Sequence, residues 1–180
     1  MAAGTEDKAA HARGLCEQAR WRELLDFAAN WSEAPPADYR AHYYLGLGHS
    51  AHGQFSQAET AYRRALALDA TDPRVWNNLA ALLYEHLQRP AEAIRCIEAA
   101  LKLNPAHKLG WANLATMVGR LGHYDKAMVC ADQAIALDPQ LVEAYLHKGA
   151  AARALGKTEV VKEVCLALAS IAPDKFQRAR

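Results

Sequence analysis

The sequence predicts an all-α protein built from repeated pairs of helices, on three observations. The pentapeptide WNNLA at residues 76–80 returns as WANLA at 111–115, so that Trp76 and Trp111 are 35 residues apart. Apolar residues recur at helical spacing, and no stretch alternates at the period of two that is typical of a half-buried strand. Prolines that cannot continue a helix close successive segments at Pro105, Pro139 and Pro173. A fixed period of this length indicates a helical repeat array.

The two pentapeptides set the register of the repeat. Aligning them divides most of the chain into segments 39–72, 73–107, 108–141 and 142–175, the second with one extra residue. Residues 5–38 form a degenerate further unit, and residues 176–180 form a short C-terminal tail. We therefore expect a single array over 1–180, with about five helix-turn-helix units.

Each segment contains the signals of two helices and a turn. In 73–107 the first helix carries an apolar face that includes Trp76, Leu79 and Leu83. The turns are predicted at Gly53, Gly122 and Gly156, and near Gln88-Arg89-Pro90 in the second segment. Small residues predict close approach of the paired helices: Gly46, Ala80, Ala115 and Gly149 in first helices, and Ala58, Ala65, Ala93, Ala100, Ala127 and Ala134 in second helices.

This pattern closely resembles the tetratricopeptide repeat family. Segment 108–141 carries the family pattern as Trp111, Leu114, Ala115, Gly122, Tyr124, Ala127, Ala134 and Pro139. Segment 39–72 has Ala70 where proline is usual, and 142–175 departs most, with Lys148 for the core leucine and Val161 for alanine. The resemblance implies a right-handed α-α superhelix whose first helices line a concave, partner-binding groove. It also implies that the last segment is a partly exposed terminal unit.

Carrying the family's inner-face positions onto this sequence gives the candidate partner-binding residues. These are Arg40, Tyr43, Tyr44, Leu47, Arg74, Asn77, Asn78, Tyr84, Asn113, Thr116, Arg120, His147 and Arg153.

Three features of this set suggest how a ligand is held, and each has a plainer alternative. Asn78 and Asn113 occupy equivalent positions and form either a ladder on a peptide backbone or bonds to water or a neighbouring helix. Tyr43, Tyr44 and Tyr84 form either an aromatic binding platform or ordinary helix packing. The arginines outnumber Glu85 and Glu143, which favours an acidic peptide unless these charges are simply solvated. The resemblance does not extend to the clamp for chaperone C-terminal tails. Asn78 matches the middle asparagine of that clamp, but Tyr43 and Leu47 replace its first pair of residues and Leu109 and Asn113 its last pair.

Composition excludes several classes of function. The net charge is +1, from 21 basic and 20 acidic residues, which gives no general attraction to nucleic acid. No apolar run is long enough for a membrane span, and the N-terminus lacks the apolar core of a secretory signal. Cys96, Cys130 and Cys165 follow the repeat spacing, so we interpret them as packing residues and reduced thiols of a cytoplasmic protein.

No catalytic or cofactor site is predicted. His49 and His52 are spaced like two metal ligands, but the sequence supplies no third ligand nearby, so we expect no metal site. Phosphate-binding loops, dinucleotide-binding motifs and nucleophile elbows are all missing, and we expect no enzyme activity and no cofactor. The hypothesis is a non-catalytic adaptor or scaffold that binds a peptide or protein segment. The alternatives are a self-assembling homo-oligomer and an interaction domain of a larger enzyme or regulatory complex.

Overall fold

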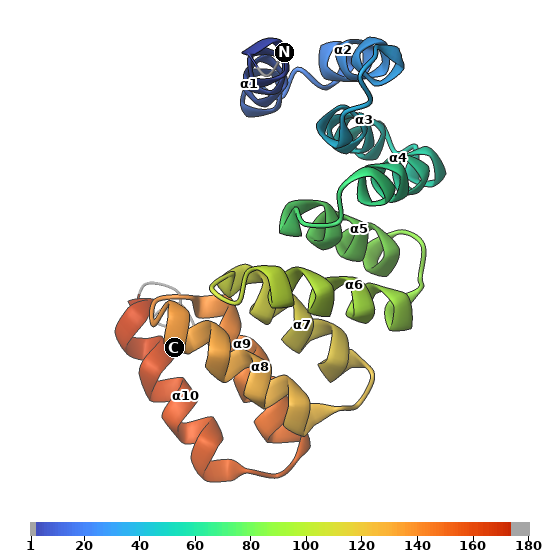
Figure 1. Ribbon diagram of the computed structural model, residues 1–180. Helices are drawn as coiled ribbons and strands as arrows, with labels where there is room; N and C mark the ends of the chain where they lie inside the picture. The colour runs from blue at the N-terminus through green and yellow to red at the C-terminus, as the bar shows by residue number, and fades with distance from the viewer. Residues whose placement is uncertain (1–2, 174–180) are drawn as a thin grey trace. The chain divides into compact units, whose positions relative to one another are not determined.

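The computed structural model describes residues 3–173, and every regular element within that range is an α-helix (Figure 1). The all-α prediction is confirmed. The chain divides into two compact units, residues 1–103 (unit 1) and residues 104–180 (unit 2). The predicted tail, 176–180, lies outside the described residues, and the handedness of the superhelix stays a prediction.

Unit 1 consists of three successive helical hairpins. Its helices are α1 (Ala3–Glu17), α2 (Trp21–Glu33), α3 (Tyr39–Ala51), α4 (Phe55–Leu68), α5 (Pro73–Glu85) and α6 (Pro90–Leu103). Each helix packs on the next in chain order, and α1 also touches α3. The helices α3 and α5 are first helices of their hairpins, and α4 and α6 are second helices.

Unit 2 contains two hairpins. Its helices are α7 (Lys108–Arg120), α8 (Tyr124–Leu137), α9 (Val142–Ala154) and α10 (Thr158–Ile171). The first helix of the second hairpin, α9, packs against α7, α8 and α10. This arrangement brings the exposed sides of α7 and α9 together.

The turns inside the hairpins use a left-handed residue. Gly53, Gly122 and Gly156 have φ of +70°, +83° and +69°, and the predicted breaks at these glycines are confirmed. Gln88 and Ala19 take the same role with φ of 52° and 54°. A side chain in this region is strained, so these two turns are less favourable than the glycine turns.

Trp76 on α5 and Trp111 on α7 each form a hydrogen bond to the loop that precedes their helix. Trp76 Nε1 donates to the carbonyl oxygen of Ala70 at 2.8 Å, and Trp111 Nε1 donates to that of Pro105 at 2.9 Å. In both cases the acceptor lies six residues earlier, beyond the helix start. The same indole serves the same purpose in both units, which explains why the pentapeptide returns.

Small residues set the spacing inside the hairpins, as predicted. Ala58 and Ala65 are fully buried on α4. A Cβ on Gly46 would lie only 2.5 Å from Cε1 of Tyr62, so α3 and α4 approach more closely than alanine would allow. The equivalent Gly149 in unit 2 would bring a Cβ to 3.1 Å from Cγ1 of Val164.

The last hairpin is partly exposed, as expected from its departures from the repeat. Lys148 is half-buried and pairs with Asp132 at 2.7 Å, so a carboxylate on α8 balances the charge that stands in place of the leucine. The interpretation of the cysteines as packing residues holds for Cys96 and Cys130, which are buried, but is wrong for Cys165. Cys165 is exposed on α10, and no helix of the described chain follows to cover it.

Candidate interaction surfaces

In each unit, the predicted binding residues lie on the first helices. The α3/α5 face of unit 1 comprises Arg40, Tyr43, Tyr44, Leu47, Arg74, Asn77, Asn78 and Tyr84. The α7/α9 face of unit 2 comprises the predicted Asn113, Thr116, Arg120, His147 and Arg153, together with Leu109, Leu146 and Ala150.

On the α3/α5 face, the arginines are engaged with the caps of their own helices. Asp38 and Asp72 each accept a backbone N–H at 2.9 Å, from Arg40 and Arg74 respectively. The guanidinium of the same arginine then folds back onto the carboxylate, at 3.0 Å for Arg40 and 2.6 Å for Arg74. Arg40 also pairs with Glu6 at 2.7 Å. Both positive charges are therefore largely neutralised before a ligand arrives.

The Asp72 carboxylate is held ionised by this arrangement. It is buried, and Tyr39 Oη donates a further hydrogen bond to it at 3.3 Å. Burial alone raises the pKa of Asp72, but the hydrogen bonds from Arg74 outweigh it and leave the pKa below its ordinary value. This makes the cap a fixed structural charge rather than a group available for acid-base chemistry.

Tyr43 and Tyr44 do not form an exposed platform, and the alternative of ordinary helix packing holds for both. Their exposed fractions are 8% and 4%, and burial raises the pKa of Tyr43 to about 12. Tyr44 stacks on Trp31, with 6.3 Å between ring centroids, and the guanidinium of Arg74 lies 5.2 Å from the ring of Tyr43. Large neighbours from α2 and α5 cover both rings, which therefore stabilise unit 1. Leu47 and Tyr84 remain partly exposed.

The asparagines of α5 are directed at their own protein. Asn78 Nδ2 donates to Tyr43 Oη at 3.3 Å, the neighbouring-helix alternative for this residue. Asn77 has its Oδ1 buried, without a hydrogen-bond partner among the described residues. Asn113, the counterpart of Asn78 in unit 2, is exposed. The two asparagines thus share a register position but have different environments.

The α7/α9 face is more open and carries apolar side chains. Leu109, Asn113, Thr116 and Arg120 follow one another at helical spacing along one side of α7, away from its buried residues. Leu109 and Leu146 are each 50% exposed, although both are large apolar residues. Thr116 on α7 bonds His147 on α9, so the exposed sides of the two helices form one continuous surface.

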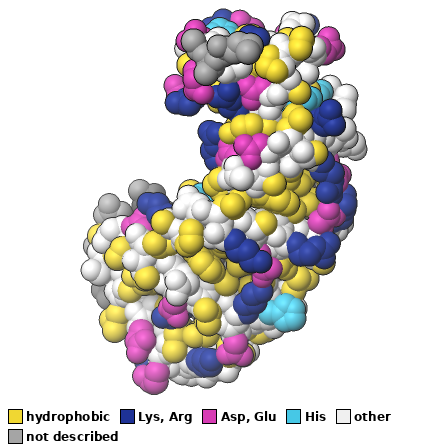
Figure 2. Space-filling view, in the orientation of Figure 1, with side chains coloured by type: hydrophobic (Ala, Val, Ile, Leu, Met, Phe, Trp, Pro, Cys, Tyr) yellow, Lys and Arg dark blue, Asp and Glu magenta, His cyan; other side chains and the backbone are white. Residues whose placement is uncertain are grey.

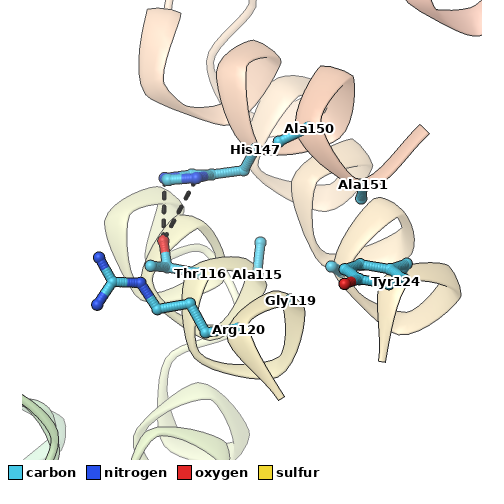
Figure 3. Close-up of a pocket in the computed structure, with 9 residues that line it drawn as sticks. Ala115, Thr116, Gly119, Arg120, Tyr124, His147, Ala150 and Ala151 are labelled. Atoms are coloured by element: carbon cyan, nitrogen blue, oxygen red, sulfur yellow. Dashed lines mark hydrogen bonds between the residues drawn. The ribbon is translucent and has the colours of Figure 1, made fainter. Parts of the chain in front are cut away.

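A pocket of about 310 Å³ opens on this face (Figure 3). Its walls are the small residues Ala115, Gly119, Ala127, Ala150 and Ala151, and its polar groups come from Thr116, Arg120, Tyr124 and His147. Three of these polar residues belong to the predicted set, whereas Tyr124 and the alanines do not. The sequence signal for this pocket is a pair of small residues, Gly119 and Ala150, on the exposed sides of α7 and α9.

Hydrogen bonding in the pocket centres on the Thr116 hydroxyl. It donates to the carbonyl oxygen of Ala112 at 3.1 Å, and the imidazole of His147 lies beside it, with Nε2 at 3.0 Å and Nδ1 at 3.5 Å. Burial lowers the pKa of His147; Glu143 opposes this and the charge of Arg120 adds to it. The imidazole is therefore neutral near pH 7.

Charges elsewhere are mixed in sign. On the face shown in Figure 2, basic and acidic side chains are interspersed. In unit 1, Arg63 on α4 and Arg89 in the turn before α6 both pair with Glu59 and with Glu92. Within residues 3–173, no helix has the length and apolarity to cross a membrane. The same range places no three His, Cys, Asp or Glu residues together in a way that could hold a metal ion.

Sequence comparisons find repeats of one kind along the chain. Models described as "TPR repeat" and "Tetratricopeptide repeat" match residues 49–86, and residues 73–107 and 110–141, respectively. Protein FlbA of Caulobacter vibrioides is 35% identical over 89 residues, which cover 49% of this chain and 15% of FlbA. The human protein O-mannosyl-transferase TMTC3 is 39% identical over 67 residues, 37% of this chain and 7% of TMTC3. The chain thus matches only a small part of the length of these curated relatives.

Solved structures show the same fold at low sequence identity. A crystal structure of MamA protein superimposes with a TM-score of 0.81 at 18% identity, covering 100% of this chain and 98% of MamA. YrrB, described as a TPR protein with an unusual peptide-binding site, gives 0.79 at 18% identity, with 93% and 86% coverage. PilF of Pseudomonas aeruginosa gives 0.81 at 19% identity, with 93% and 76% coverage.

Proposed function

The chain belongs to the tetratricopeptide repeat family, and from that premise we propose that it is a non-catalytic scaffold that holds a segment of another protein on the exposed sides of its first helices. The observation that supports this most is the α7/α9 face. It exposes Leu109 and Leu146 to half their extent beside the exposed Asn113, on helices whose other sides are buried in the repeat core. Exposed large apolar residues near hydrogen-bonding groups are typical of a protein-binding surface.

The description of YrrB supports the same interpretation, because peptide binding is recorded there on a similar fold. The partner we propose is a protein or peptide segment. Asn113 would bond its backbone, and the two leucines would contact apolar side chains. The four cysteines are free thiols, which suits a reducing compartment, and we propose the cytoplasm.

The test compares surface variants in affinity capture from a lysate of the source organism. Leu109→Gln with Leu146→Gln, and separately Asn113→Ala, should lose the specific partner while the melting temperature stays unchanged. The matched control is Val129→Gln with Leu137→Gln, two exposed apolar residues on the second helix α8 of the same unit. If the wild type, the variants of the α7/α9 face and the control all retain the partner equally, binding on the α7/α9 face is refuted.

Self-assembly is the second candidate, and one observation favours it. Leu166 on α10 is 73% exposed, beside the exposed Cys165, at the end of the last described hairpin. A second copy could cover this surface as the next hairpin would. Sedimentation of the wild type and Leu166→Gln over a range of concentrations tests this. A mass that rises with concentration in the wild type alone would support it.

A further inference from the structure

We propose that the pocket between α7, α8 and α9 receives the carboxylate of a Glu or Asp side chain in the bound segment, and that this binding takes up one proton on His147. The inference rests on the function proposed above and specifies the chemistry of the partner. It is carried by the pocket's lining, its hydrogen bonds and its charges.

The lining has the size and polarity for one acidic side chain. Its volume of about 310 Å³ is at the small end of ligand sites, which are roughly 300–1,000 Å³. Alanine and glycine walls suit the methylene groups of such a side chain. Arg120 and His147 are the groups of the lining that can carry positive charge, and no carboxylate is among its residues. In Figure 3, the guanidinium of Arg120 extends to the side on which Thr116 and His147 lie, and Tyr124 lies on the opposite side of the lining.

The hydrogen bonds explain why a proton is needed. The Thr116 hydroxyl has one proton, which it donates to the Ala112 carbonyl, so its oxygen can only accept from His147. A neutral imidazole has one N–H, and Thr116 already accepts it. A second donor, directed at a ligand carboxylate, exists only when both ring nitrogens are protonated.

The charges around His147 determine whether the affinity for the ligand rises or falls with pH. Arg120 on α7 and Tyr124 on α8 line the same pocket, and Glu143 lies one turn away on the helix of His147. The side of α10 that packs on α9 contributes the apolar Val164 and Leu168. Burial and Arg120 disfavour the imidazolium in the free protein, and an incoming carboxylate would reverse this balance. Affinity should therefore increase as the pH falls from about 7.5 to about 6, while the ligand carboxylate stays ionised.

The test uses two pools of capped hexapeptides, identical except that a central position is fixed as Glu in one and Gln in the other. Retention by immobilised protein is measured at about pH 6 and about pH 7.5. We expect the wild type to retain the Glu pool about tenfold better than the Gln pool at the lower pH, with a smaller ratio at the higher pH. Arg120→Gln should remove the preference for Glu, and His147→Gln should remove its pH dependence.

Matched variants separate the pocket from general effects. Arg95→Gln on α6 changes the net charge equally, and His123→Gln removes an exposed imidazole outside the pocket; both should behave as wild type. Ala150→Leu should fill the pocket and abolish the preference for Glu without changing charge. Thermal melts of all variants establish that they are folded.

The outcomes distinguish carboxylate binding in the pocket from peptide binding on the α7/α9 face as a whole. Equal retention of both pools by the wild type, or a pH effect that persists in His147→Gln, would overturn the pocket's role and leave peptide binding standing. Retention of neither pool, together with capture from lysate that Leu109→Gln/Leu146→Gln does not affect, would overturn both. A preference for Glu that Ala150→Leu and Arg120→Gln both remove would support the pocket as its site.

Discussion

Replacing Gly46 by alanine should destabilise unit 1, although alanine is the better helix former. The added Cβ would lie 2.5 Å from Cε1 and 2.6 Å from Cδ1 of Tyr62. These distances are roughly 1 Å shorter than the ~3.5–4.0 Å at which carbon atoms pack favourably. Tyr62 is only 1% exposed, so its ring cannot move aside into solvent.

Two opposing effects set the size of the change. Overpacking a tight contact costs about 1–3 kcal/mol, whereas alanine in place of glycine in a helix contributes about 0.5–1 kcal/mol of stability. The clash is with a buried ring rather than the end of a flexible side chain, so we expect the cost to lie in the upper part of its range. The net loss in the free energy of unfolding should be about 1–2 kcal/mol.

Urea unfolding followed by far-UV circular dichroism measures this change, with Gly14→Ala in α1 as the matched control. A Cβ on Gly14 meets nothing within 4 Å, so the same substitution should there stabilise by about 0.5–1 kcal/mol. Tyr62→Leu should make Gly46→Ala less costly than it is in the wild type, which a double-mutant cycle detects. A Gly46→Ala protein as stable as the wild type would show that the close approach of α3 and α4 is not a constraint.

Three other substitutions test separate features by the same unfolding measurement. Ala19→Gly should stabilise by about 1 kcal/mol by relieving a left-handed alanine, and an unchanged midpoint would contradict the strained turn. Trp111→Phe should cost about 1 kcal/mol, because it removes the 2.9 Å hydrogen bond to Pro105, and no loss would mean that the indole N–H contributes nothing. The pKa of His147 is lower in the folded chain, so the unfolded chain binds its proton more readily. Stability should therefore fall as the pH drops through about 6.5, and less so in His147→Gln; equal profiles would refute this.

The fold was predictable because each repeat must meet the same physical requirements, so the same residue types recur at equivalent positions. Each hairpin needs a helix-ending residue with positive φ, and Gly53, Gly122 and Gly156 supply it at matching positions. The first helices α5 and α7 use their tryptophan in the same way, as the bonds of Trp76 and Trp111 show. An unusual residue in one repeat therefore does not change the prediction, because the equivalent positions of the other repeats still indicate the same structure.

The candidate surfaces were harder to predict, because exposure depends on neighbours that the repeat register does not specify. Tyr43 and Tyr44 occupy inner-face positions, but the bulk of Trp31 and Tyr62 makes them core residues. Arg74 is partly exposed on α5, yet its charge is engaged by Asp72, two residues earlier. Position along the repeat predicts which side of a helix a residue occupies, whereas burial and pairing require three-dimensional neighbours.

The pocket escaped prediction for a related reason. A cavity forms where side chains are too small to fill the space between helices. Gly119 and Ala150 leave such a space only because α7 and α9 pack side by side, which neither residue indicates alone. Thr116, Arg120 and His147 were nevertheless on the predicted face. A search for small residues flanking predicted polar groups on consecutive first helices would have identified the site.

The two faces differ in what they leave for a ligand, which argues that recognition is concentrated on unit 2. Each face has a side-chain hydrogen bond between successive first helices, from Asn78 to Tyr43 in unit 1 and between His147 and Thr116 in unit 2. In unit 1 that bond ends on a buried tyrosine, in a region whose arginines are bound to their own caps. In unit 2 it ends at the wall of a pocket, beside exposed leucines. Substitutions on the α3/α5 face should therefore change stability more than binding, and those on the α7/α9 face should do the opposite.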